Sequence, residues 1–210
     1  IDVRLVGSEM CIRDRKCRVL KVSYAGEKGF EIHIANNSMS KVYNELIKFG
    51  ENYDLVHFGM LALDSMRLEK NYRSWKSDLT SDYSILQSGL DRWINFSKES
   101  FIGKEALTRE SEIGVTKKFV TLVVDDPEDN KAFGEPVYLS PVFAGDKYLG
   151  PVVSSGYGHR VKKSISMAIL DDRNLDGLND QLHIDVLGRK RKAHIVKEAL
   201  YDPENNRLRS

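Results

Sequence analysis

The stretch VSYAGEKGFEIHI, residues 22–34, carries the clearest fold signal in the chain. Residues 19–24 are rich in β-forming side chains, Gly26 and Gly29 bracket a tight turn, and residues 30–34 alternate apolar with polar side chains. Such alternation is typical of a half-buried strand. The stretch therefore predicts a β-hairpin.

The second strand of this hairpin presents an acidic side chain on its polar face. Since successive side chains of a strand point to opposite faces, Phe30, Ile32 and Ile34 share the core face. Glu31 and His33 then point away from the core. A carboxylate on a rigid strand offers two in-plane acceptors, which match adjacent N–H donors of a planar heterocycle such as a pterin. The alternative is a solvated strand carboxylate without a ligand.

A second informative stretch, LDSMRLEKNYRSW at residues 63–75, joins a helix to a loop. Apolar spacing predicts a helix over residues 58–70, and Asn71, which tolerates positive φ, is its expected left-handed stop. Arg67 then lies near the helix end, close to the loop that carries Trp75. Such a junction can shape a binding site because rigid neighbours hold it.

Three further elements are predicted in the first half of the chain. Ser38 or Ser40 can cap an amphipathic helix that Gly50 ends. Residues 89–96 predict a strand, and residues 103–112 predict a helix.

From residue 117 onward, short β-rich runs alternate with Pro, Gly and Asp. Several short strands at such spacing are typical of a small barrel or sandwich. We place the boundary of this second domain near residues 114–116. The predicted strands cover residues 119–124, 136–143, 148–154, 165–170, 182–187 and 193–197.

Composition excludes several classes of partner. The chain has 210 residues, 41% of them hydrophobic, enough for one good core or two small ones. Lys plus Arg (32) nearly balance Asp plus Glu (31), so no overall field favours nucleic acid or an anionic membrane. No apolar run approaches the roughly 20 residues of a spanning helix. We interpret the basic run at residues 189–192 as a solvated hairpin turn.

The sequence gives little support for a metal site, a disulfide framework or a catalytic nucleophile. Of two cysteines, Cys11 and Cys17, the first lies in a segment that we regard as non-native, so no disulfide framework follows, and a reducing, cytoplasmic setting fits. The five histidines are scattered, without metal-site spacing. Residues 154–156, SSG, lack the G-x-S-x-G frame of a nucleophile and predict a barrel turn.

Five segments, in their order along the chain, resemble the aminomethyltransferase (glycine-cleavage T-protein) family, closest to the C-terminal folate-binding region of dimethylglycine and sarcosine dehydrogenases. They are SYAGEKGFEI, SMRLEKNYRSW, SGLDRWINF with ESFIGKEAL, VVSSGYGHRVKKSISMAIL and ALYDPENNRLRS. The resemblance implies an α+β fold. The second half of a T-protein-type folate-binding domain is expected over residues 16–114, followed by a small antiparallel β-barrel over residues 115–210.

The resemblance also implies a site for tetrahydrofolate. Family members line the folate pocket with residues matching Tyr24 and Glu31, and an aromatic at the place of Trp75 lies near the ring. Arg67 is a weaker fourth position, directed at the ligand's glutamate tail. Each residue has a structural alternative: Tyr24 as a cross-strand aromatic, Trp75 as core or interface, and Arg67 as an ion-pair partner of nearby carboxylates, Asp64 or Glu69.

Departures from the family pattern bear on which branch the chain resembles. T-proteins usually have a substrate-contacting arginine where Leu63 stands, so its absence favours the dehydrogenase branch. The family usually has glycine at the place of Asn71. A Thr-Pro-x-Glu pattern has become SILQ at residues 84–87, which removes a carboxylate and a rigid turn.

Residues 5–15, LVGSEMCIRDR, resemble translated sequencing adapter, and no turn pattern joins them to the first strand. A short natural arm is the alternative. We therefore expect residues 1–15 to be a non-native tail and the chain to be a fragment. The family's catalytic aspartate is then expected in a missing upstream half. FAD is expected only in a missing upstream flavin domain, because no Gly-x-Gly-x-x-Gly occurs in the chain.

Taken together, these features predict the tetrahydrofolate-binding portion of a dimethylglycine or sarcosine dehydrogenase-like enzyme. The flavin site would oxidise a small N-methyl amine, tetrahydrofolate would accept the one-carbon unit, and the fragment alone would be inactive. Alternatives within the fold are a stand-alone aminomethyltransferase and a folate-dependent demethylase. An alternative of another class is a non-catalytic folate-binding or partner-docking module.

Overall fold

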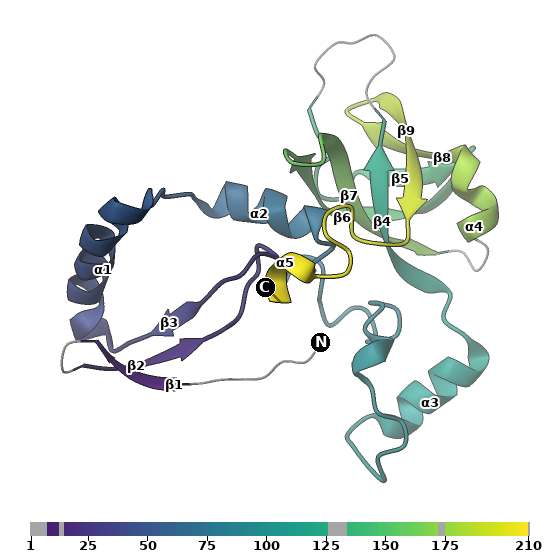
Figure 1. Cartoon of the computed structure of the whole chain (residues 1–210). Coiled ribbons are helices and arrows are strands. Elements are labelled where there is room, and N and C mark those ends of the chain that lie inside the picture. Colours follow the sequence, from purple (N-terminus) through teal and green to yellow (C-terminus); the bar gives the residue numbers. More distant parts are fainter. Residues whose placement is uncertain (1–7, 13–14, 126–133, 172–174, 210) are drawn as a thin grey trace. The chain divides into compact units, whose positions relative to one another are not determined.

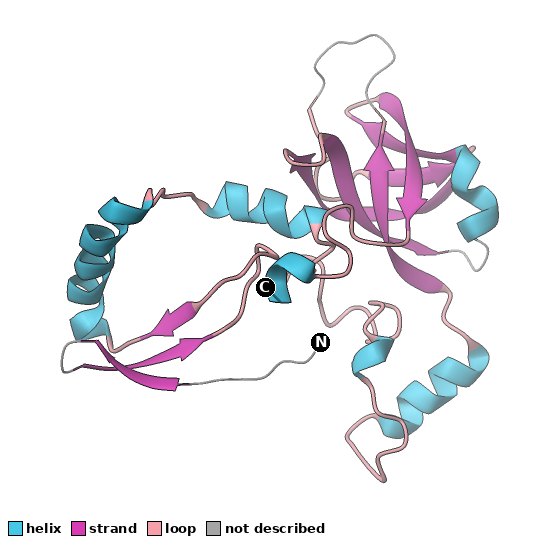
Figure 2. Cartoon of the chain, viewed as in Figure 1, coloured by secondary structure: helices cyan, strands magenta, loops and turns pink. Residues whose placement is uncertain are grey.

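The computed structural model describes residues 8–12, 15–125, 134–171 and 175–209 (Figure 1). The chain divides into two compact units: unit 1 comprises Ile1–Arg67 and Asp202–Ser210, and unit 2 comprises Leu68–Tyr201. Figure 2 shows that helices and strands occur together, as the α+β prediction requires. In the part of the chain that is described, no helix has the length and apolar character needed to cross a membrane.

Unit 1 contains a small antiparallel sheet of β1 (Ser8–Ile12), β2 (Arg15–Leu20) and β3 (Glu31–His33), with β2 in the middle. The predicted hairpin exists as the β2–β3 pair, with Val19 opposite Ile32. Its first strand ends earlier than predicted.

A loop over residues 21–30 therefore connects β2 and β3 in place of a tight turn. Within this loop Gly29 lies close to Val22 and Ser23. A Cβ added at Gly29 would be 3.0 Å from both the Ser23 Cβ and the Val22 carbonyl oxygen. Strand β1 was not indicated by the sequence: it pairs with β2 from Ser8 opposite Val19 to Ile12 opposite Arg15.

Unit 1 continues into helical structure. Helix α1 (Asn36–Gly50) begins after Ala35, so the prediction of a serine cap is wrong, whereas its end at Gly50 is confirmed. A 3₁₀ turn, η1 (Glu51–Tyr53), follows. The division between the units falls inside α2 (Met60–Glu69).

Asn71 ends the α2 segment in the predicted left-handed conformation. Its φ is 57°, and its N–H donates to the Leu68 carbonyl at 3.0 Å. Its side-chain Oδ1 also accepts a 2.7 Å hydrogen bond from the Thr121 hydroxyl of the first barrel strand. The side chain therefore both permits the turn and ties it to the barrel.

The strands of unit 2 close into the predicted antiparallel barrel, in the order β4-β7-β6-β5-β8-β9. All six predicted strands are confirmed, with shifted ends. They are β4 (Lys117–Val124), β5 (Pro141–Ala144), β6 (Lys147–Gly158), β7 (Lys163–Asp171), β8 (Leu182–Val186) and β9 (Arg189–Val196).

Apolar clusters occupy both faces of the barrel wall. The interior is filled by side chains from every strand, among them Leu122, Val142, Leu149, Leu170 and Ile184. A second cluster on the other face joins Val153, Ile165, Met167 and Ile169 to Leu68, with Tyr83, Phe119, Val161 and Leu200 packed against it. Strand β7 is consequently buried on both faces over 164–170.

Five short helical elements complete the chain. They are η2 (Asp91–Trp93), α3 (Lys104–Ile113), α4 (Leu175–Leu178), η3 (Asn179–Gln181) and α5 (Asn206–Arg209). Helix α3 confirms the helix predicted over residues 103–112. The prediction of a strand over residues 89–96 is wrong. Gly89 takes a φ of 63°, and the Leu90 and Trp93 N–H groups donate hydrogen bonds within local turns.

The basic run at residues 189–192 also differs from its prediction. It lies in β9, and the hairpin turn consists of Leu187 and Gly188, with φ values of 53° and 81°. Arg191 is buried, and its Nε and Nη2 donate to the Asp125 carbonyl at 3.0 and 2.8 Å. The side chain closes the barrel end where the sequence suggested a solvated turn.

Gly150 of β6 lies directly against the backbone of β7. Its φ is 154°, and a Cβ there would collide with the Ile169 carbonyl oxygen of β7. We expect Gly150→Ala to destabilise unit 2 by about 1–3 kcal/mol from overpacking, with about 1–3 kcal/mol more from backbone strain. Urea unfolding followed by circular dichroism measures this. Gly134→Ala, in open space, is the control; equal stability of the two variants would contradict the account.

Candidate functional site

Glu31 opens strand β3 of unit 1 and faces solvent. Its Oε2 lies 3.2 Å from the His33 Nε2, so the two side chains share one face of the strand, as the alternation predicted. The Glu31 and His33 side chains are 59% and 56% exposed. A carboxylate held this way remains accessible to a ligand with paired N–H donors.

Tyr24 lies in the loop between β2 and β3, where its side chain is exposed. The interpretation of Tyr24 as a cross-strand aromatic is therefore wrong, because β2 has ended at Leu20. The loop that carries Tyr24 leads directly into Glu31. These two predicted site residues thus belong to one short, glycine-constrained segment of unit 1.

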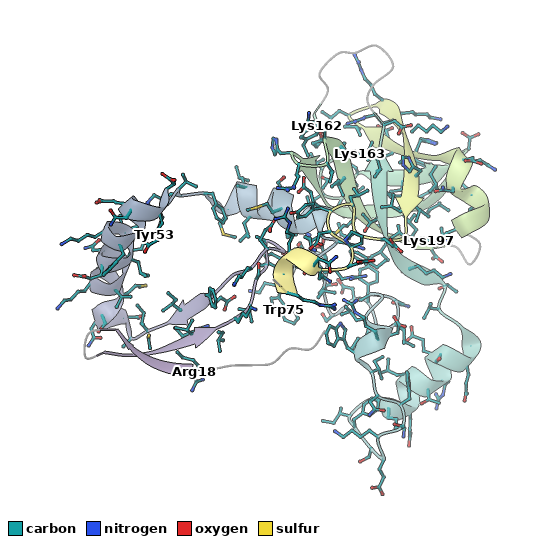
Figure 3. All side chains as sticks on the ribbon, viewed as in Figure 1. Arg18, Tyr53, Trp75, Lys162, Lys163 and Lys197 are labelled. Carbon is teal, nitrogen blue, oxygen red and sulfur yellow. The ribbon has the colours of Figure 1, made fainter. Side chains whose placement is uncertain are left out.

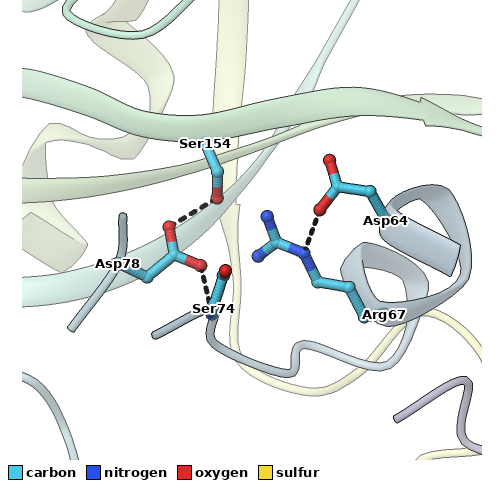
Figure 4. Close-up of polar contacts among 5 residues, drawn as sticks. All are labelled: Asp64, Arg67, Ser74, Asp78 and Ser154. Carbon is cyan, nitrogen blue, oxygen red and sulfur yellow. Dashed lines mark hydrogen bonds and ion pairs between the residues drawn. The ribbon is translucent and has the colours of Figure 1, made fainter. Parts of the chain in front are cut away.

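Arg67 is the third predicted site residue of unit 1, and it is buried. Its Nε donates a 2.6 Å hydrogen bond to the Asp64 Oδ1 one turn earlier in α2 (Figure 4). The ion pair with Asp64, an alternative that the sequence left open, is thus present. One edge of the guanidinium is engaged within the helix.

Trp75 belongs to unit 2 and sits on a closed loop, where it is labelled in Figure 3. The Ser74 carbonyl accepts hydrogen bonds from the Asp78 and Leu79 N–H groups at 3.0 and 3.1 Å, and Lys76 N–H donates to the Leu79 carbonyl at 3.1 Å. The Trp75 side chain is 77% exposed at the tip of this loop. The core alternative for Trp75 is therefore wrong.

Asp78, which the sequence did not single out, holds the base of this loop. Its Oδ2 accepts the Ser74 N–H at 2.7 Å, and its Oδ1 accepts the Ser154 hydroxyl of β6 at 2.6 Å (Figure 4). Asp78 is fully buried. Asp in a turn is a weak local signal, and its barrel partner is 76 residues away, so no local pattern could reveal the contact.

Residues 154–156 lie within strand β6, so the predicted barrel turn is wrong. The SILQ segment, in contrast, keeps a turn without the family's proline. The Gln87 N–H donates to the Ser84 Oγ at 3.1 Å while the Ser84 N–H donates to the Gln87 Oε1 at 3.2 Å. This reciprocal pairing has the pattern of a capping box.

Glu69, also absent from the predicted site, joins three segments of unit 2. Its buried Oε1 accepts the N–H groups of Arg160 and Val161 at 2.7 and 3.2 Å, and its carbonyl accepts the Tyr201 N–H at 3.0 Å. The Arg160 guanidinium and the Lys70 ammonium lie 4.5 and 5.7 Å from the Tyr201 ring centroid. These are favourable cation–π distances.

Arg73, two residues before Trp75, also contacts the barrel. The Arg73 guanidinium lies 4.3 Å from the Phe119 ring centroid of β4. Burial and then the neighbouring Arg92 lower the pKa of Arg73, while the Asp78 and Asp91 carboxylates oppose that shift. Arg73 is therefore electrostatically coupled to Asp78, the carboxylate that also accepts the Ser74 N–H.

Two family models match the chain and identify its class. Residues 6–98 match the GCVT N-terminal domain, and residues 117–202 match the glycine cleavage T-protein C-terminal barrel domain. The chain belongs to the glycine cleavage T-protein family. Mixed helices and strands with a closed barrel are the architecture that these two models describe.

Curated relatives come from two branches of this family. The chain is similar to mitochondrial dimethylglycine dehydrogenase of Rattus norvegicus (30% identity over 203 residues, 94% of this chain and 22% of the relative). It is equally similar to aminomethyltransferase of Alkaliphilus oremlandii (31% over 195 residues, 92% and 51%) and to mitochondrial sarcosine dehydrogenase of Mus musculus (29% over 199 residues, 91% and 21%).

The chain thus spans about half the length of the aminomethyltransferases and about a fifth of the dehydrogenases. A solved structure with the same fold is the glycine cleavage system aminomethyltransferase T from Bartonella henselae. Its TM-score is 0.76 at 19% identity, covering 89% of this chain and 50% of that one.

The Glu69 junction can be tested by removing its charge. In Glu69→Gln the Oε1 acceptor survives, but an amide nitrogen replaces the second carboxylate oxygen in a buried site. Since hydrogen bonds to charged groups contribute about 1.5–3 kcal/mol, we expect a loss of about that size from the free energy of unfolding. Urea denaturation measures it, with exposed Glu112→Gln of α3 as the control. Equal midpoints for the two variants would show that Glu69 is dispensable.

Proposed function

We propose that this chain is the tetrahydrofolate-binding portion of a one-carbon transfer enzyme, and that the whole enzyme resembles dimethylglycine and sarcosine dehydrogenases. Membership in the glycine cleavage T-protein family supports folate-dependent one-carbon transfer. The single observation that carries the proposal is the exposed carboxylate of Glu31, held on a short strand in the segment most similar to the family's folate site.

Glu31 is assigned to the pterin edge. Two coplanar oxygens complement the N3–H and 2-amino donors of a pterin, and paired charge-assisted hydrogen bonds fix orientation as well as affinity. Tyr24 supplies a ring surface from the adjoining loop. The Glu31 Oε2 already lies 3.2 Å from the His33 Nε2, so the ligand would compete with an existing contact. When bound, tetrahydrofolate supplies the nitrogens that accept the one-carbon unit.

Trp75 and Arg67 have less direct support. The exposed indole of Trp75 is free to meet a flat ring, as the family resemblance implies. Arg67 is proposed to face the ligand's glutamate tail, although its Nε is engaged by Asp64. The Arg67 side chain is 2% exposed, so this assignment rests on the family resemblance alone.

Leu63 supports the dehydrogenase branch, since T-proteins usually place a substrate-contacting arginine there. Sequence identity does not separate the branches, at 30% and 31% for the two relatives named first. A stand-alone aminomethyltransferase is therefore the second candidate. A folate-dependent demethylase and a non-catalytic folate-binding module are further alternatives.

In the dehydrogenase assignment the remaining chemistry lies outside this chain. We propose that an upstream flavin domain holding FAD oxidises a small N-methyl amine, and that the family's catalytic aspartate belongs to an upstream half of the folate domain. We propose a cytoplasmic location from the cysteine content alone; the two dehydrogenase relatives described above carry mitochondrial names.

Glu31→Gln tests the pterin assignment. The substitution keeps shape and removes charge, so the binding free energy for 5-formyltetrahydrofolate should weaken by about 1.5–3 kcal/mol, the range for hydrogen bonds to charged groups. Isothermal titration calorimetry measures the difference. The matched control is Glu51→Gln, an exposed carboxylate of η1 in the same unit. Unchanged affinity in Glu31→Gln would remove this residue from the site.

Turnover tests the larger assignment. The chain alone should produce no methylene-tetrahydrofolate from dimethylglycine or sarcosine, because the proposed flavin and aspartate are elsewhere. A protein that joins the chain to the upstream sequence of its gene should produce it in a folate-dependent manner. Turnover by the chain alone would refute this assignment and favour a self-sufficient transferase.

A further inference from the structure

The Trp75 loop is held from beneath by a pair of residues that neither the sequence motifs nor the proposed function assigns. Asp78 is fully buried, and both of its carboxylate oxygens accept a hydrogen bond: one from the Ser74 N–H and the other from the Ser154 hydroxyl (Figure 4). One bond is internal to the loop, and the other crosses to strand β6. The carboxylate thus links the loop to strand β6, in addition to the contact of Arg73 with Phe119 of β4.

A β-bulge makes this link possible. Val152 of β6 pairs with Ala168 of β7, but Ser154 pairs with Met167, so Val153 is an extra residue in the ladder. Val152 lies in the interior cluster, whereas Val153 and Met167 lie in the outer cluster. Since directly paired residues share a face, Ser154 is also directed outward. A regular strand would have directed it inward; bulges re-aim side chains in this way.

The loop itself has little else to fix its tip. Lys76 takes a φ of 73°, and Trp75 is bridged to Leu79 across the loop. The indole is 77% exposed, so packing contributes little to its placement. The position of Trp75 therefore follows from the base of the loop, where Asp78 closes the turn and contacts the barrel.

We propose that Asp78 and Ser154 are positioning residues, through which the barrel sets the place of the Trp75 ring. The barrel then acts as a rigid support for a ligand-contacting aromatic, beyond completing the fold. Its consequence for ligand binding rests on the proposed function, which assigns Trp75 to the folate ring. The mechanical part, that Ser154 restrains Trp75, stands independently of any ligand.

Fluorescence of Trp75 tests the mechanical part. The chain contains two tryptophans, so Trp93→Phe leaves Trp75 as the sole tryptophan, which can be excited at wavelengths that tyrosine does not absorb. In this background Ser154→Ala should increase the amplitude of fast local motion in the time-resolved anisotropy of Trp75, measured well below the unfolding temperature. Ser154→Thr, which keeps the hydroxyl and suits a strand, should restore the parent decay. An unchanged decay in Ser154→Ala would overturn the proposal.

A matched control separates positioning from general stability. Ser155→Ala removes the neighbouring hydroxyl of β6, which donates to the Pro136 carbonyl and has no bond to the loop among those described. It should leave the Trp75 anisotropy unchanged even if it lowers the melting temperature. Asp78→Asn is the second variant, for the case that Ser154→Ala fails to fold; it also should loosen Trp75, because the amide cannot accept at both positions. Equal effects of Ser154→Ala and Ser155→Ala would count against positioning.

The ligand arm uses 5-formyltetrahydrofolate and calorimetry. Ser154→Ala should weaken binding by about 2- to 10-fold, the range that corresponds to losing one ordinary hydrogen bond, and Ser154→Thr should restore it. If the parent protein binds no folate while the anisotropy responds as expected, the proposed function fails and the positioning role of Asp78 and Ser154 remains. If binding and anisotropy are both unaffected by Ser154→Ala, the inference itself fails.

Discussion

The described part of unit 2 depends on one buried carboxylate, that of Glu69. It receives backbone N–H groups from the β6–β7 turn, and its own carbonyl receives one from Tyr201. A charge taken out of water is tolerated only when donors replace its hydration. The turn packs closely against Glu69: a Cβ added at Gly158 would lie 2.9 Å from the Glu69 Oε1. The end of α2, the barrel and the C-terminal segment are thereby fixed to one another within this unit.

The apolar packing explains why the barrel needs these neighbours. Strand β7 is buried on both faces, and closing the barrel buries only two of its five apolar side chains, Ala168 and Leu170. The other three pack in a cluster with Leu68, Tyr83 and Leu200, which come from segments before and after the barrel strands. Hydrophobic burial of one such side chain contributes about 1.5–3 kcal/mol. The barrel and its outer layer consequently form one compact unit, which begins at Leu68 although β-rich composition begins near residue 117.

Local sequence patterns predicted the elements that are determined by residues close in sequence. They did not predict the contacts between residues that are far apart in sequence and close in space. The barrel strands, helix α3 and the left-handed Asn71 follow from alternation, punctuation by glycine and the tolerance of Asn for positive φ. The strand predicted over residues 89–96 failed because local turns claimed its N–H groups. The bridging roles of Asp78 and Glu69 were not predicted, because their partners Ser154 and Arg160 lie 76 and 91 residues away.

Two of the residues assigned to the ligand, Glu31 and Trp75, contrast with the buried carboxylates Asp78 and Glu69. The Glu31 and Trp75 side chains are 59% and 77% exposed, so each is accessible to a ligand. A group that fixes a loop must be satisfied internally, and Asp78 and Glu69 are 0% and 3% exposed. Resemblance to a family identifies the first kind, whose role is chemical. Buried carboxylates of this kind are identified from the hydrogen bonds that their oxygens accept. A buried oxygen without a hydrogen bond would lower the free energy of unfolding by about 1–3 kcal/mol. For the Trp75 loop, the hydrogen bonds that Asp78 accepts identify it as the residue that joins the loop to strand β6 of the barrel.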